Sequence, residues 1–197
     1  MIWIEATAVL FGLLCVWLTI RQNILCWPTG LVQVVLYIFI FYKALLYSDM
    51  LLHGIYVVMQ IYGWHHWLHG GQGKTELRVS VMSAPLLVKW FCVGAFGTII
   101  WGYLMANYTQ AAAPYADALI AVVSLIAQWL MACKRLESWL FWILVDLVAI
   151  AVYFYKSLYL TMGLYAVFLV LATMGYFHWK AALPAKRLAA TLTGVTD

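Results

Sequence analysis

Charged side chains are scarce in this chain: they make up 9% of its 197 residues, while 67% of the residues are hydrophobic. A soluble globular domain carries about 25% charged residues, so the composition excludes that class. Short runs of alternating polarity, typical of a transmembrane barrel, are missing as well. Long apolar runs remain, and they must be helices because hydrocarbon offers the backbone no hydrogen-bond partner. The sequence therefore predicts an all-α integral membrane protein.

Motifs for covalent or hydrolytic chemistry are also lacking. The four cysteines lie singly among apolar residues without CxxC spacing, which indicates packing residues. No phosphate-binding glycine loop and no Ser-His-Asp arrangement can be read, so we do not expect ATP-driven or hydrolytic activity. The last apolar run has no lysine before Lys180 at its edge, which excludes the Schiff base of a retinal protein. No basic residue precedes the first apolar run, which we interpret as a retained span and not a cleaved signal peptide.

Seven apolar runs are long enough to cross about 30 Å of hydrocarbon. They cover residues 3–20, 25–43, 50–68, 85–106, 115–133, 138–155 and 159–179. With this topology, nine of the eleven Lys and Arg residues lie on one side of the membrane, and only Lys43 and Lys156 lie on the other. The positive-inside rule makes the nine cytoplasmic, which predicts an outside N-terminus and a cytoplasmic C-terminus. The net charge of +4 then reflects topology, and no nucleic-acid partner is expected.

The second half of the chain resembles the first. A shift of 112 pairs Trp17 with Trp129, and a shift of 113 pairs Gln33 with Asp146, Phe41-Tyr42-Lys43 with Phe154-Tyr155-Lys156, Gln60 with Thr173 and His65 with His178. Three helices per repeat is an odd number, so the fourth span restores the orientation and predicts a 3+1+3 layout with parallel repeats. The expected parts are a first repeat (1–68), a cytoplasmic loop and linking helix (69–110), a second repeat (111–180) and a cytoplasmic tail (181–197). Parallel repeats are a known transporter plan, with the substrate held near the midplane between the halves.

Asp146 is the only one of the seven acidic residues that lies in the middle of a span. A carboxylate there costs about 2.5–3.5 kcal/mol, so it should face the bundle or a wet cavity and mark a functional site. The alternative is a hydrogen bond that pins two helices together. At the shift of 113, Gln33, Gln60 and Thr173 would surround the same axis at mid-depth.

Aromatic side chains follow these polar residues at helical spacing. Trp64 and Trp142 lie one turn from Gln60 and Asp146, and Tyr37 and Tyr176 extend the same faces. Tryptophan and tyrosine around one carboxylate suit an aromatic cation, through stacking and cation–π attraction. The alternative interpretation is that these rings pack against helices or lie in the membrane interface.

Histidines gather near the predicted cytoplasmic end, at His65, His66, His69 and His178. His65 and His69 have the spacing of two metal ligands on one helix face, so a metal-dependent membrane enzyme is a distant alternative. Interfacial hydrogen bonding is the favoured interpretation, and neither a metal nor a cofactor is predicted.

Several segments resemble the Pnu-type, PnuC-like family of bacterial vitamin transporters, over essentially all seven spans. They are Trp3-Ile4-Glu5-Ala6, Asn23, Tyr62-Gly63-Trp64-His65-His66-Trp67 and Glu137-Ser138-Trp139-Leu140-Phe141-Trp142. The resemblance implies a fold similar to that of the SWEET sugar facilitators, a homotrimer and a place in the bacterial inner membrane. It also implies facilitated diffusion of an unphosphorylated vitamin that a kinase later traps.

The departures from the family concern the substrate. The resemblance implies that the family's nicotinamide riboside carriers have asparagines at the positions that match Gln33, Asp146 and Met174 of this chain. The carboxylate favours the thiamine branch, PnuT, because thiamine is an aromatic cation with an aminopyrimidine; nicotinamide riboside, also cationic, is the alternative. The expected substrate-binding residues are Gln33, Tyr37, Gln60, Trp64, Trp142, Asp146, Thr173 and Tyr176, and the possible gate residues are His65, Trp67 and His178.

Overall fold

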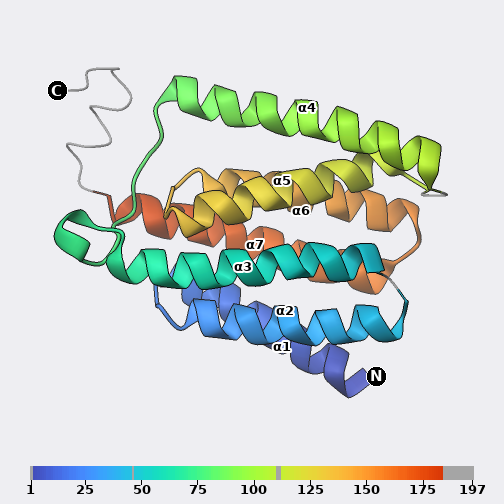
Figure 1. Ribbon diagram of the computed structural model, residues 1–197, viewed down its shortest axis with the longest axis horizontal. Coiled ribbons are helices and arrows are strands. Elements are labelled where there is room, and N and C mark those ends of the chain that lie inside the picture. Colours follow the sequence, from blue (N-terminus) through green and yellow to red (C-terminus); the bar gives the residue numbers. More distant parts are fainter. Residues whose placement is uncertain (1, 46, 110–111, 184–197) are drawn as a thin grey trace. The chain divides into compact units, whose positions relative to one another are not determined.

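The computed structural model describes residues 2–45, 47–109 and 112–183, and these ranges are almost entirely helical (Figure 1). The helices are α1 (Ile2–Ile20), α2 (Cys26–Lys43), α3 (Tyr47–His69), the short 3-10 helix η1 (Gln72–Lys74), α4 (Ala84–Tyr108), α5 (Pro114–Ala132), α6 (Ser138–Tyr155) and α7 (Tyr159–Ala181). The predicted all-α class is confirmed, and no boundary of the seven α-helices lies more than three residues from its predicted place. Most of the predicted cytoplasmic tail, from residue 184 on, lies outside the described residues.

Six of these helices are long and apolar enough to cross a membrane, and α3 is the exception. The difference comes from composition, because α3 carries Asp49, Gln60 and several histidines within its 23 residues. Polar groups in a span are costly and usually serve a function. The most polar of the described helices is therefore also the one that carries four of the expected binding or gate residues, Gln60, Trp64, His65 and Trp67.

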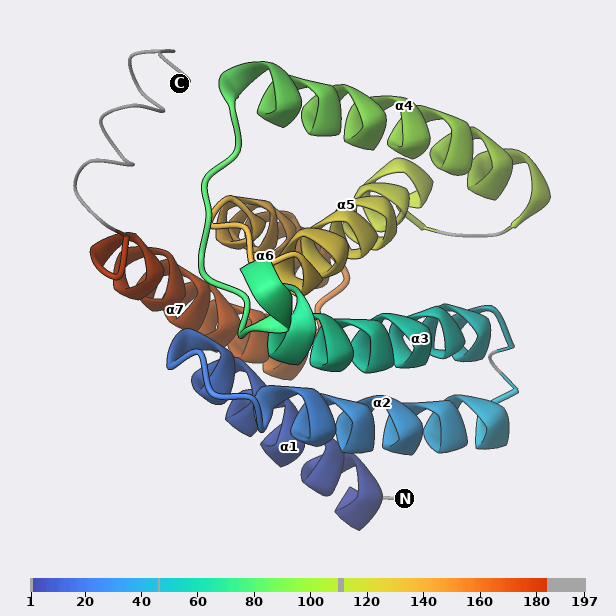
Figure 2. The same cartoon turned by 60° about the vertical axis from the view of Figure 1, so that its left-hand side comes forward.

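Contacts divide the chain into two units, the first of which comprises Met1–Arg78 and Ala132–Lys134. Within it, α2 packs against both α1 and α3 (Figure 2). Trp27, at the start of α2, meets Trp67 of α3 edge to face, with ring centroids 5.3 Å apart. The indole of Trp27 lies directly over Gly63, where any side-chain carbon would overlap the ring. A glycine one turn before Trp67 thus lets the two helices approach.

The second unit comprises Val79–Met131 and Arg135–Asp197, with α4, α5, α6 and α7. Its core contains Met82 from the segment before α4, apolar residues of α5, and Phe141 and Val145 of α6. The ring of Phe91 on α4 stacks on Phe141 with centroids 4.8 Å apart. Burial of such a contiguous apolar cluster holds α4, α5 and α6 together, and α7 packs against α6.

The same three-helix pattern occurs in both units. The bounds of α5, α6 and α7 are those of α1, α2 and α3 moved by 112 residues at every end. Trp139 and Trp179 repeat the edge-to-face pair of the first unit at 5.4 Å, over Gly175. Left-handed backbone recurs at the same interval, at Gln22 and Lys134 and again at Leu45 and Ser157. The internal repeat is therefore present in helix lengths, turns and packing.

The residue pairings predicted at a shift of 113 are wrong by one position. At the observed shift, Gln33 corresponds to Val145, Gln60 to Ala172, Asp146 to Val34, Thr173 to Ile61, and His178 to His66. One residue turns a helix by about 100°, so the error moves a side chain to another face. Sequence matching within apolar runs does not detect a one-residue error in the shift, because adjacent residues are equally hydrophobic. The candidate polar residues are thus particular to one repeat each.

Candidate functional site

Asp146 lies at the centre of α6 and is only 4% exposed. Within the described ranges, its carboxyl group makes neither a hydrogen bond nor an ion pair. Buried polar groups in proteins almost always have a partner, and a carboxylate in hydrocarbon without one is costly. Trp142, one turn earlier on the same helix, packs its half-buried ring against the core of the second unit. A carboxylate with a neighbouring indole can take a cation.

Two candidate residues of α7, Thr173 and Tyr176, already interact with other residues of the same helix. The hydroxyl of Thr173 donates to the backbone oxygen of Leu169 at 2.8 Å, which leaves its lone pairs as acceptors. Tyr176 is half-buried, and the ammonium nitrogen of Lys180 lies 5.7 Å from its ring centre. The exposed His178 lies on the same helix. Thr173 can therefore accept a further hydrogen bond, whereas its own proton is used within the helix.

Two glutamines of the first unit lie against glycines of the preceding helix. The amide of Gln60, a side chain only 8% exposed, occupies the space next to Gly30 of α2. The amide nitrogen of Gln33 lies 2.7 Å from where a Cβ on Gly12 of α1 would be. In the part of the chain that the structure describes, neither amide makes a side-chain hydrogen bond. Each amide thus has both its donor and its acceptor to offer.

Tyr37 belongs to an aromatic cluster around His53 on α3. The imidazole centre lies 5.6 Å from Tyr37, 4.9 Å from Phe41 and 5.6 Å from Tyr56. The second unit repeats part of this cluster, where the ring centroid of Tyr165 lies 5.3 Å from that of Tyr153 and 6.1 Å from that of Phe168. Tyr37 itself corresponds to Ala149, so its ring is an addition of the first repeat.

Trp64 and His65 line an open hollow of about 230 Å³ on α3, together with Ile61, Leu68 and His69. The rings of His65 and His69 lie 4.7 Å apart, and Nδ1 of His69 is 3.1 Å from the backbone oxygen of His65. Among the described residues, no group of three or more His, Cys, Asp or Glu side chains is placed to hold a metal. The geometry therefore lends no support to a metal-dependent enzyme.

Trp67 is 2% exposed and takes part in a second contact that spacing did not predict. The ammonium nitrogen of Lys134 lies 4.3 Å from its ring centre and donates to the backbone oxygen of Leu77 at 2.9 Å. The amide of Leu77 in turn donates to the oxygen of Trp67 at 2.9 Å. Burial lowers the pKa of Lys134. The sequence alone identified this lysine only as one of the nine basic residues from which the topology was predicted.

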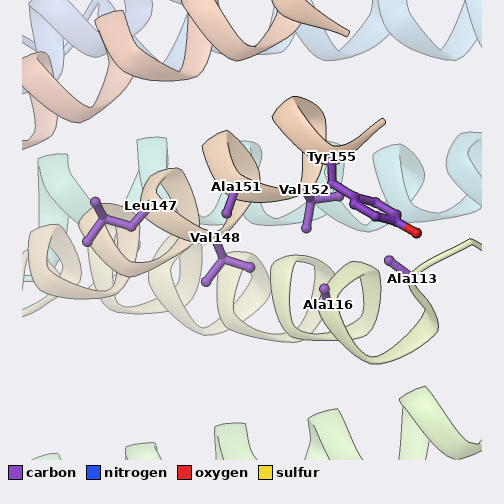
Figure 3. A pocket seen from close by; sticks show the side chains of 7 residues that line it. All are labelled: Ala113, Ala116, Leu147, Val148, Ala151, Val152 and Tyr155. Atoms are coloured by element: carbon purple, nitrogen blue, oxygen red, sulfur yellow. The ribbon is translucent and has the colours of Figure 1, made fainter. Parts of the chain in front are cut away.

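The second unit has an apolar groove of about 420 Å³ between α5 and α6 (Figure 3). Its lining residues are Ala113, Ala116, Leu147, Val148, Ala151, Val152 and Tyr155. The corresponding positions of the first repeat carry Ile4 and Phe39 where the groove has Ala116 and Ala151. None of the expected binding residues lines this groove, and Tyr155 is the only polar side chain among its lining residues.

Comparison with known proteins gives the family. A family model described as nicotinamide mononucleotide transporter matches residues 2–181. This chain belongs to that family. Among its relatives, the nicotinamide riboside transporter PnuC of Neisseria mucosa is 31% identical over 189 residues, which cover 90% of this chain and 72% of the relative. PnuC of Escherichia coli K12 is 27% identical, covering 90% of this chain and 84% of the relative.

Two further similarities show the range of the family. The riboflavin/roseoflavin transporter RibM of Streptomyces davaonensis is 25% identical, with 90% of this chain and 84% of RibM covered. A crystal structure of the vitamin B3 transporter PnuC matches with a TM-score of 0.72 and 26% identity, covering 91% of this chain and 81% of that one. The chain is thus a membrane protein of a vitamin-transporter family. The expected thiamine branch finds no support among these relatives, which carry nicotinamide riboside or riboflavin in their names.

Proposed function

We propose that this protein is a facilitator for the uptake of nicotinamide riboside. The family match and the relatives named nicotinamide riboside transporter support this substrate over thiamine. Thiamine and nicotinamide riboside are both aromatic cations, so the chemistry of the candidate residues suits either. The names of the relatives are therefore the reason why nicotinamide riboside is proposed ahead of thiamine.

The observation that carries the proposal is the buried carboxylate of Asp146, which has no partner among the described residues. A pyridinium ring beside this carboxylate would supply the missing positive charge, and the indole of Trp142 one turn away would stack on a flat cation. The amides of Gln33 and Gln60 would pair with the carboxamide and ribose groups. In the proposal, Tyr37, Trp64, Thr173 and Tyr176 also contact the substrate, and His65, Trp67 and His178 act at its exit.

An unphosphorylated cation fits these groups better than the mononucleotide. A phosphate recognised inside a protein usually meets arginine or lysine. Within the described helices, basic residues lie only near the ends, as Lys43, Lys89 and Lys180 do. A phosphate beside Asp146 would therefore add repulsion without a compensating cation. Riboflavin carries no positive charge and would leave the carboxylate unpaired.

The remaining parts of the proposal concern topology and assembly. In it, the protein lies in a bacterial inner membrane with its N-terminus outside, has the SWEET-like 3+1+3 layout with parallel repeats, and works as a homotrimer. The repeats are residues 1–68 and 111–180, joined by the loop and helix of residues 69–110. A cytoplasmic kinase would phosphorylate the vitamin and so prevent its return.

A titration panel tests the substrate. Detergent-purified protein is titrated with nicotinamide riboside, nicotinamide mononucleotide, thiamine and riboflavin by calorimetry. We expect nicotinamide riboside to bind at least tenfold more tightly than the other three, and reconstituted vesicles to take it up without ATP until the concentrations inside and outside are equal. Tighter binding of thiamine would return the protein to the thiamine branch, and tighter binding of riboflavin would remove the role proposed for Asp146.

A further inference from the structure

Gln60 is held in a space that only a glycine on α2 can leave open. A Cβ on Gly30 would overlap the amide nitrogen of Gln60 and would lie 3.0 Å from the sulfur of Cys15 on α1. When two atoms would approach within 3.0 Å, one of the two groups has to move. The thiol of Cys15 is held in place because it donates a hydrogen bond to the backbone oxygen of Cys26 at 3.2 Å. The amide is the group that would have to move. Gly30 therefore determines where the amide of Gln60 can lie.

The second repeat reverses the sizes at the two equivalent positions. At a shift of 112, Gly30 corresponds to Trp142 and Gln60 corresponds to Ala172, which is 3% exposed. The first repeat thus combines a small residue on its second helix with a long amide on its third. The second repeat combines a large indole on its second helix with a small residue on its third. At these two equivalent positions the larger side chain therefore belongs to the third helix in the first repeat and to the second helix in the second repeat.

We infer that Gly30 is a positioning residue for substrate recognition, because it leaves open the space in which α3 presents the amide of Gln60. The inference rests on the proposed function. The buried amide of Gln60 has no hydrogen bond within the described residues, and such a group is stable where a ligand completes its bonding. Gly30 acts only through Gln60 and itself touches no substrate.

A double-mutant cycle on the full-length protein tests this inference. Binding of nicotinamide riboside is measured by calorimetry for Gly30→Ala, for Gln60→Ala and for the double variant. We expect each single change to weaken binding about 3- to 15-fold, the loss expected for one or two hydrogen bonds. The double variant should bind no more weakly than Gln60→Ala, because Gly30 matters only while the amide is present. A double variant weaker than Gln60→Ala by the full Gly30→Ala factor would overturn the inference.

Gly54→Ala is the matched control, since it adds the same methyl group to a helical glycine of the same unit and meets nothing within 4 Å. We expect it to bind like the wild type. Thermal unfolding of all variants distinguishes a variant that fails to fold from a folded variant in which the amide of Gln60 is displaced. If Gly30→Ala fails to fold but the double variant folds, the overlap with Gln60 is supported; if both fail, the inference is wrong. A wild type that does not bind nicotinamide riboside would refute the proposed function, while the unfolding temperatures would still report on the Gly30–Gln60 contact.

Discussion

The two repeats share a scaffold and differ in chemistry. Both pack an indole from the second helix edge to face on an indole from the third, at 5.3 Å in one and 5.4 Å in the other. In the first repeat, polar character comes from two amides that lie against glycines. In the second, it comes from the buried carboxylate of Asp146, whose counterpart is Val34. The two copies share the packing where their helices meet, and they differ in the polar groups that they carry.

The connections after the first helix of each repeat differ in the same way. Gln22 and Lys134 occupy equivalent left-handed positions, with φ values of 54° and 51°. Lys134 is buried, lies over Trp67 and bonds to Leu77. Three residues later, Glu137 accepts a hydrogen bond from the amide of Met82 at 2.8 Å, whereas Leu25 stands at the equivalent position. The second copy has therefore gained charged contacts in a loop whose backbone is the same.

The largest effect is expected from Asp146→Asn, which removes the charge that distinguishes the second repeat. Loss of a charge-assisted contact should weaken binding of nicotinamide riboside about 10- to 150-fold, equivalent to about 1.5–3 kcal/mol. Glu137→Gln is the control, because it removes one carboxylate outside the spans and should leave affinity unchanged. Unaltered binding by a folded Asp146→Asn variant would reduce this carboxyl to a structural role.

The shared scaffold can be probed by adding one methyl group to each repeat. Gly63→Ala and Gly175→Ala should each destabilise the protein by about 1–3 kcal/mol, because a Cβ would overlap Trp27 or Trp139. Gly54→Ala and Gly163→Ala meet nothing within 4 Å and should be neutral or stabilising by about 0.5–1 kcal/mol. Thermal unfolding in detergent measures all four. A loss in only one of the first pair would show that the two copies are not packed alike.

A smaller effect is expected where the loops differ. Lys134→Met keeps the aliphatic stem but removes the bond to Leu77 and the cation over Trp67, at a cost of about 1 kcal/mol. Hydrogen exchange of the segment 70–78 should then become about fivefold faster, which mass spectrometry can follow. Gln22→Met, at the equivalent position of the first repeat, is the control. Equal exchange in the two variants would show that Lys134 does not hold the segment.

The smallest effect concerns the pH dependence of stability. Burial raises the pKa of Glu137, one of whose carboxyl oxygens is buried without a hydrogen bond in the described residues. The folded protein then binds this proton more tightly than the unfolded chain does, so stability falls as the pH rises above about 4.3. Glu137→Gln should remove that decline. Unfolding temperatures between pH 4 and 7 should therefore fall more steeply for the wild type; parallel curves would contradict the role of this carboxyl.

Much of the fold could be predicted because the bilayer imposes the length of each apolar run and charged residues separate the runs. Helix α6 was predicted at its observed bounds, Ser138–Tyr155. The register of the repeat was not, since Phe41-Tyr42-Lys43 and Phe154-Tyr155-Lys156 match by composition while the helices correspond one residue away. Asp146 was the easiest candidate to find, because a carboxylate in the middle of an apolar run stands out without any knowledge of contacts.

The sequence by itself determined the class of protein, the positions of the helices and the one acidic residue in the middle of a span. These properties depend on hydrophobicity along the chain, which is local. Only the tertiary structure decided that Gln60 lies against Gly30, that Trp64 is 38% exposed while Trp67 is 2% exposed, and that Lys134 is buried. Such facts depend on which helix faces which, and one residue of register, a rotation of about 100°, changes every one of them.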